Sequence, residues 1–233
     1  GSMAAIQKVA TSNYAVSEEF IEGGPGNDRA STQTQTQYNA TQQFTTQFFD
    51  QYSDWFIQRQ VEGKIRDCHG DLHLNNICFY PDKIRIFYCI EFNTAFRMID
   101  VIYDVAFLVM DLEFQGRADL ANLFLNTYLE QTGDYWGAAL LPLYLSMRAY
   151  IRGNVNSLAL KDPAISDADK SGFLQRGKAY YRLAWEYTQR SQGKLLLMSG
   201  LSGSGKSSIA RQLAQRVNAL HLRSDAVRKH LSS

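Results

Sequence analysis

The sequence predicts an α+β protein that is mainly helical, with one small β element and an incomplete C-terminal strand–loop–helix–strand unit. Apolar residues recur with helical spacing over most of residues 101–190. A run rich in β-forming residues, 84–92, interrupts the helical pattern. A short apolar strand pattern at 195–198 then precedes a glycine-rich loop. The 233 residues are enough for one large domain, or for one domain and part of another.

The N-terminal residues carry few signals of folded elements. Gly1-Ser2-Met3 is typical of a cloning tag before a start methionine. Residues 23–28 contain glycines and a proline, which interrupt helices. We therefore expect residues 1–30 to be a tag and a poorly ordered segment. Thr and Gln make up 12 of the 17 residues in 31–47, which predicts a loop or a loose helix.

Helical periodicity dominates the following 140 or so residues. Six aromatic residues are spaced along one helical face, and we expect them to be core: Phe44, Phe48, Phe49, Tyr52, Trp55 and Phe56. Further helices are predicted at 101–114, 119–131, 137–160 and 168–190. The composition changes near 191–193, so we predict one unit over 31–190 and a second over 194–233.

The C-terminal unit contains a phosphate-binding P-loop pattern between two predicted strands, 195–198 and 219–222. Its glycines allow backbone N–H groups to turn inward around a polyphosphate, and the following helix directs its positive end at the same anion. Lys206 can place a charge on the outer phosphates, and Ser207 a hydroxyl on Mg²⁺. The predicted nucleotide-binding residues are Gly200, Gly203, Ser204, Gly205, Lys206, Ser207 and Ser208.

Composition argues against several other classes of protein. The net charge of +1 does not favour a nucleic-acid partner, which would require clustered Lys and Arg. No apolar run has the length of a membrane span, and no signal peptide is visible. Three cysteines without metal-binding spacing are typical of reduced thiols. We therefore expect a cytoplasmic protein without a membrane or nucleic-acid partner.

The segment from His69 to Asn76, His-Gly-Asp-Leu-His-Leu-Asn-Asn, resembles the catalytic loop of aminoglycoside phosphotransferases and choline kinases. These enzymes are built like protein kinases, so the resemblance implies a kinase-like C-lobe over residues 31–190. It implies that Asp71 accepts the proton of a substrate hydroxyl and that Asn76 binds Mg²⁺. His69 and His73 would brace the loop, although a simple hydrogen-bonded role also fits each ring. Asp104 would hold the loop by hydrogen bonds.

The P-loop segment resembles the start of small P-loop kinases such as gluconate kinase and the zeta toxins. By this resemblance Asp225 is a substrate contact or base, and Arg228 contacts substrate or phosphate. The alternative is a helix N-cap and a solvated charge. The order of the two motifs is similar to that of bacterial two-part proteins that join an aminoglycoside-phosphotransferase-like domain to a P-loop ATP-binding domain. ATP and Mg²⁺ are the cofactors implied, with an unidentified hydroxyl compound as acceptor.

Two departures from these families predict that the chain is catalytically impaired. Tyr88 stands where the family carries its second metal-binding Asp, and Glu91 would face the opposite side of a strand. Residues 4–60 show no strands of an N-terminal β-lobe, and the P-loop unit lacks its later strands before residue 233. The alternative is a non-catalytic, pseudokinase-like fragment for binding or self-association, with exposed strand edges that could form a homodimer. An interaction module based on the Thr/Gln segment is a third possibility.

Overall fold

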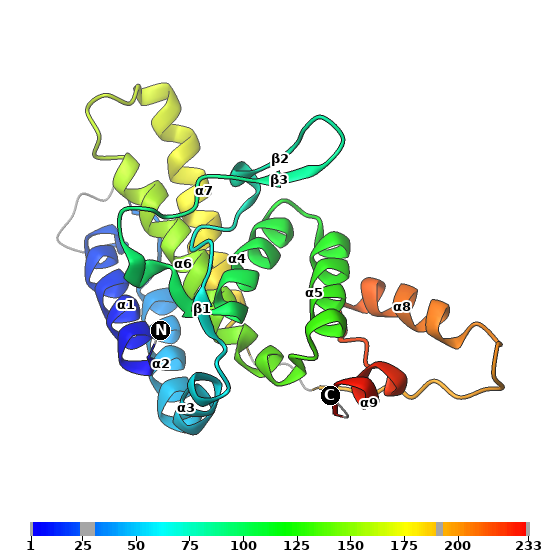
Figure 1. Ribbon diagram of the computed structural model, residues 1–233. Helices are drawn as coiled ribbons and strands as arrows, with labels where there is room; N and C mark the ends of the chain where they lie inside the picture. Colours follow the sequence, from blue (N-terminus) through cyan, green and yellow to red (C-terminus); the bar gives the residue numbers. More distant parts are fainter. Residues whose placement is uncertain (1, 24–30, 190–192, 232–233) are drawn as a thin grey trace.

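The computed structural model describes residues 2–23, 31–189 and 193–231 (Figure 1). Helix α4 (Val101–Phe114) lies at its centre, with α5 (Ala118–Thr132) on one side and α6 (Leu141–Ala159) on another. Helix α7 (Asp167–Glu186) packs along α6, and a 3₁₀ turn, η5 (Tyr135–Leu140), leads from α5 into α6. The predicted mainly helical α+β class is confirmed.

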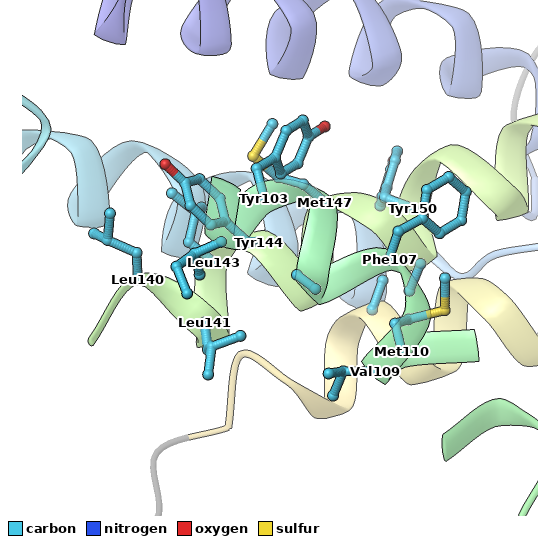
Figure 2. Close-up of a cluster of buried hydrophobic side chains, with 14 of the residues drawn as sticks. Tyr103, Phe107, Val109, Met110, Leu140, Leu141, Leu143, Tyr144, Met147 and Tyr150 are labelled. Atoms are coloured by element: carbon cyan, nitrogen blue, oxygen red, sulfur yellow. The ribbon is translucent and has the colours of Figure 1, made fainter. Parts of the chain in front are cut away.

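Helix α4 is central because its sequence is apolar on every side. Residues 102–112 are all buried, which is typical of a helix surrounded by other elements. Figure 2 shows its side chains interleaved with those of α6 in one cluster. The Asp100 carboxylate caps the helix by accepting a hydrogen bond from the Ile102 backbone. The long apolar contact with α6 fixes the position of every residue that α4 carries.

The N-terminal segment differs from the sequence expectation. Residues 3–17 form helix α1 (Met3–Ser17), followed by a 3₁₀ turn, η1 (Glu18–Phe20). Ile6, Ala10 and Tyr14, spaced four apart, are buried where α1 packs on α6 and α2. The expectation of poor order was therefore wrong for these residues, while residues 24–30 lie outside the described part of the chain.

The Thr/Gln-rich segment forms helix α2 (Gln35–Gln51), which is followed by α3 (Ser53–Val61). A capping box between Thr34 and Gln37 starts α2, and this pattern is readable in the sequence. The aromatic face was correctly predicted as core, but it is divided between two helices at Tyr52. Phe48, Phe49 and Phe56 are buried.

The β structure consists of two short antiparallel pairs. Strand β1 (Ile65–Asp67) pairs with β4 (Met98–Asp100), and β2 (Ile77–Phe79) pairs with β3 (Ile84–Ile86) as a hairpin. Short 3₁₀ turns, η3 (Leu74–Asn76) and η4 (Thr94–Phe96), lie between them. The small β element was predicted around 84–92, but strand β3 ends at Ile86. Within residues 2–23 and 31–61, which are helical in the main, no β-lobe is present.

The C-terminal segment contains α8 (Lys206–Val217) and α9 (Ser224–Leu231) without the predicted strands. Residues 195–198 and 219–222 are unpaired in the described part of the chain, and the Leu195 side chain is 80% exposed. A buried parallel strand requires neighbouring strands and covering helices, and the described residues supply none here. Instead, α8 packs directly on α5. The homodimer prediction relied on these strand edges and stays a prediction.

A buried charge network joins elements that are distant in the sequence. The Arg59 guanidinium of α3 donates to both carboxylate oxygens of Asp100, at 2.5 and 2.6 Å. It also donates to both oxygens of Asp134, at 2.8 and 2.9 Å. All three side chains are at most 5% exposed. The network therefore fixes α3 against the start of α4 and the η5 turn.

Among the helices of the described residues, none combines the length and the apolar character that crossing a bilayer requires.

Candidate functional site

The backbone of the 69–76 loop is held in place by Asp104 of α4. Its two carboxylate oxygens accept hydrogen bonds from the backbone N–H groups of His69 and Gly70, at 2.9 and 3.0 Å. Gly70 adopts a φ of +83°, and a Cβ there would lie only 2.9 Å from the Phe96 carbonyl oxygen. The bend that carries the loop to Asp71 therefore requires glycine at this position.

The Asp71 carboxylate is 39% exposed and is oriented by two neighbours. Its Oδ2 lies 3.2 Å from His73 Nε2 and accepts a 3.0 Å hydrogen bond from the Asn76 amide. Because His73 Nδ1 accepts from the Asn75 backbone, the neutral ring carries its proton on Nε2 and donates it to Asp71. Burial raises the pKa of Asp71, but the hydrogen bonds from His73 and Asn76 and nearby positive charge outweigh it and lower the pKa. Asp71 is thus an oriented anion at neutral pH.

The two histidines connect the loop to its surroundings. His69 Nδ1 accepts from the Asp71 backbone, so its Nε2 donates to the Phe87 carbonyl at 2.9 Å and ties the loop to the residues after β3. The buried His73 ring packs 5.2 Å from the Phe107 ring of α4. In this structure His69 makes structural contacts, whereas His73 contacts the Asp71 carboxylate itself.

Asp111 is a supporting residue that the sequence reading missed. Its buried carboxylate accepts a 2.9 Å hydrogen bond from the Leu74 backbone N–H and a longer one from the Tyr180 hydroxyl. It lies seven residues after Asp104, hence on the same face of α4. An acidic residue at this spacing, inside an otherwise apolar helix, was the signal available in the sequence.

The resemblance implies a second metal-binding Asp at position 88, and the structure shows an exposed tyrosine there. Tyr88 is 79% exposed, adopts a left-handed φ of +58° and packs edge-on against the Phe87 ring. Glu91 is also exposed. Among the residues that the structure describes, no group of three or more His, Cys, Asp or Glu side chains could hold a metal. In nucleotide sites Mg²⁺ is generally held by one or two carboxylates together with phosphates and waters, and the carboxylate that lies beside Asn76 here is that of Asp71.

The P-loop forms an exposed turn that leads into α8. Gly200, Gly203 and Gly205 all have positive φ values, of +151°, +75° and +81°. The Lys206 ammonium folds back over the turn, donates to the Leu201 carbonyl and lies 3.5 Å from Ser204 Oγ. No side chain caps the start of α8, and Ser207 and Ser208 are exposed. The first backbone N–H groups of α8 are thus available to an anion.

Asp225 and Arg228 lie on α9, which follows the opposite end of α8 from the P-loop (Figure 1). Asp225 pairs at 2.6 Å with Arg223, which also pairs at 2.8 Å with Glu130 of α5. Partial desolvation raises the pKa of Asp225, but the Arg223 guanidinium outweighs it and lowers the pKa. Arg228 donates to the Ser224 carbonyl one turn earlier. The structure therefore places these two predicted substrate contacts away from the Lys206 end of α8.

Polar side chains of α5 hold the segment that was expected to form the second strand. Asn122 and Asn126 both donate to the Ala219 carbonyl, and Asn126 Oδ1 accepts from the His221 backbone N–H at 2.7 Å. A cavity of about 150 Å³ lies between α5 and α8 beside these contacts. Two asparagines one turn apart on a helix were the available sequence signal for this contact, but the sequence does not show their partners, which are more than 90 residues away.

Comparison with known proteins finds a family match for each of the two parts of the chain. A profile described as the phosphotransferase enzyme family matches residues 5–144, and one described as an AAA domain matches residues 195–233. Uncharacterized proteins of Mycobacterium tuberculosis strain H37Rv and of Mycobacterium bovis are 35% identical over 179 residues. The match covers 76% of this chain and 34% of each relative, so the chain spans about a third of their length. No solved structure matches significantly.

Proposed function

The chain belongs to the phosphotransferase enzyme family, and from this premise we propose that its P-loop binds the phosphates of ATP while its catalytic loop transfers none of them. This proposal is supported by a difference between the two sites: the P-loop has the residues expected of it, and the kinase-like site lacks one. The P-loop carries its glycines, its lysine and an uncapped helix start. The catalytic loop carries Asp71 and Asn76, but further along the chain Tyr88 stands in place of the expected acidic residue.

The nucleotide-binding half of the proposal relies on the electrostatics of the α8 terminus. Uncapped N–H groups and the helix dipole favour an anion at this end. Lys206 adds a full positive charge that is bound only to neutral oxygens of the turn, so a phosphate can replace them without breaking an ion pair. Ser207 supplies a hydroxyl that could serve as one ligand of a nucleotide-bound Mg²⁺.

The non-catalytic half relies on Tyr88. Phosphoryl transfer depends on metal ions that neutralise charge developing on the phosphates. An exposed phenol does not replace a carboxylate ligand of a hard dication, so Asp71 can orient a hydroxyl but the phosphate that this hydroxyl would attack lacks one of its metal-binding groups. The competing candidate is a working phosphotransferase, favoured by the intact hydrogen bonds among Asp71, His73 and Asn76.

The test is calorimetry with ATP, with and without Mg²⁺, together with a coupled assay of ADP release. We expect binding that Lys206→Ala abolishes and that Lys194→Ala, an exposed lysine outside the loop, leaves unchanged. We expect Asp71→Asn to bind ATP as the parent chain does, and no variant to release ADP. Steady ADP release that Asp71→Asn removes would overturn the non-catalytic assignment, and absence of ATP binding would overturn the nucleotide assignment.

A further inference from the structure

Arg148 of α6 is buried beneath the catalytic loop, with only 6% of its side chain exposed. Its Nε donates to the Tyr103 carbonyl of α4 at 3.0 Å. The guanidinium carbon lies 3.7 Å from the centre of the Tyr103 ring and 4.6 Å from that of Phe107. Two aromatic faces and one hydrogen bond therefore hold a positive charge at a fixed point in the core.

Arg148 is connected to the catalytic loop through two sets of contacts. Nη2 lies 3.8 Å from Oδ1 of Asp104, the oxygen that accepts from the Gly70 backbone. On the other side, the Phe107 ring under the guanidinium contacts the His73 ring, which hydrogen-bonds to Asp71. Both the backbone of the loop and the histidine that orients its carboxylate are thus supported from Arg148.

The energetics of the site indicate a positioning role. Nη2 is fully buried without a hydrogen-bond partner, an arrangement that costs free energy in a core. Asp104 already accepts two backbone hydrogen bonds, so removal of Arg148 would leave no carboxylate oxygen unsatisfied. Removing one partner of a buried ion pair is usually destabilising, because the other charge stays buried without its counterion. In Arg148→Met the two backbone hydrogen bonds to Asp104 remain and limit this loss. What such a replacement removes is the charge that holds Asp104 in place.

We propose that Arg148 is a positioning residue that fixes the catalytic loop through Asp104 and through the Phe107–His73 contact. This role rests on the proposed function, in which Asp71 orients a hydroxyl. Its test measures the loop itself and is independent of ATP binding, so the two proposals can fail separately.

The experiment measures amide hydrogen exchange by NMR in the full chain. Arg148→Met is expected to speed exchange at His69 and Gly70 by about tenfold, the effect of one weakened charge-assisted hydrogen bond, while the amides in the centre of α4 stay protected. Arg148→Lys, which retains the charge, should restore exchange to within about threefold of the parent chain. The matched control is Arg152→Met, one turn further along α6, where the guanidinium faces Tyr180 instead.

A cycle with Asp104→Asn separates positioning from general packing. If Arg148 acts through Asp104, then Arg148→Met should add little to the faster exchange at Gly70 that Asp104→Asn already causes. Additive effects in this cycle would overturn the Asp104 route. So would unchanged exchange at His69 and Gly70, or an equal rise across α4. Should Arg148→Met fail to fold, failure of Arg148→Lys to protect the loop would also overturn the proposal.

Discussion

The side-chain oxygen of Asn126 accepts a 2.7 Å hydrogen bond from the backbone N–H of His221, so a helix of the kinase-like part directly holds the C-terminal segment. Asn126 also donates to the carbonyl of Ala219, two residues earlier. Together the two bonds imitate the alternate pairing that a neighbouring strand would provide. Helix α8 is thereby anchored at its C-terminal end, while the glycine-rich turn at its other end stays exposed.

Asn126→Ala should release this segment without unfolding the rest of the chain. The substitution removes the hydrogen-bond partner of the His221 amide, and we expect its exchange to rise by about tenfold. The melting temperature should change little, because Asn126 lies outside the α4–α6 core. Thr127→Ala is the control, since the Thr127 hydroxyl bonds only to its own helix. Equal exchange at His221 in both variants would contradict the anchoring role.

The same contact should weaken in mild acid. Desolvation by burial lowers the pKa of His221, and the nearby Arg211 and Arg223 lower it further, against a raising effect of Glu130. His221 therefore binds a proton more readily in the released segment than in the docked one. Docking is most stable above the ordinary histidine pKa of 6.5, and this stability is lost as the pH falls through the lower pKa of the docked state. Amide exchange at residues 219–223, corrected for its intrinsic pH dependence, measures this between about pH 7.5 and about pH 5.5. His221→Gln should remove the pH dependence, and its persistence in that variant would assign the effect to another group.

Local sequence signals predicted much of this structure, because the features concerned depend on short spacings. The helices predicted at 101–114 and 119–131 correspond to α4 and α5, whose limits follow from periodicity and caps. The hydrogen bonds among Asp71, His73 and Asn76 also lie within six residues, but the sequence reading named these residues by resemblance and did not predict the bonds. The errors have different physical causes. Helix α1 was missed although Ile6, Ala10 and Tyr14 show the four-residue spacing. The strand at 195–198 was expected from its composition, but a strand forms only where neighbouring strands pair with it.

Long-range polar contacts could not be predicted in this way. The partners of Arg59 are 41 and 75 residues away, and a lone arginine in an amphipathic helix gives no sign that it will be buried. The same holds for Arg148 beneath the catalytic loop, whose partner Asp104 lies on another helix. The packing of α4 against α6 brings Arg148 and Asp104 together, and Arg59 meets its partners only once α3 has packed beside the start of α4.

Arg59→Met should be among the most destabilising single substitutions in the chain. It leaves two buried carboxylates, Asp100 and Asp134, close together without their shared cation, which typically costs about 3–5 kcal/mol. Urea unfolding followed by circular dichroism measures the change. Arg182→Met is the control, because its pair with Glu186 is exposed and should contribute less than about 1 kcal/mol. A loss of stability for Arg59→Met no larger than that of the control would mean that the network is not a major stabilising element.

Tyr88→Asp is expected to fold normally and still not to transfer phosphate. Asp tolerates the left-handed backbone of position 88 better than Tyr does, and the Tyr88 side chain is exposed, so little packing is lost. The new carboxylate would supply one missing metal ligand. It would not supply the β-lobe that family members place over the phosphates, which residues 2–23 and 31–61 do not form. The coupled assay of ADP release, with Tyr80→Asp as a control at another exposed tyrosine of the same region, tests this. Turnover in Tyr88→Asp that the further change Asp71→Asn abolishes would show that a single carboxylate separates this chain from an active phosphotransferase.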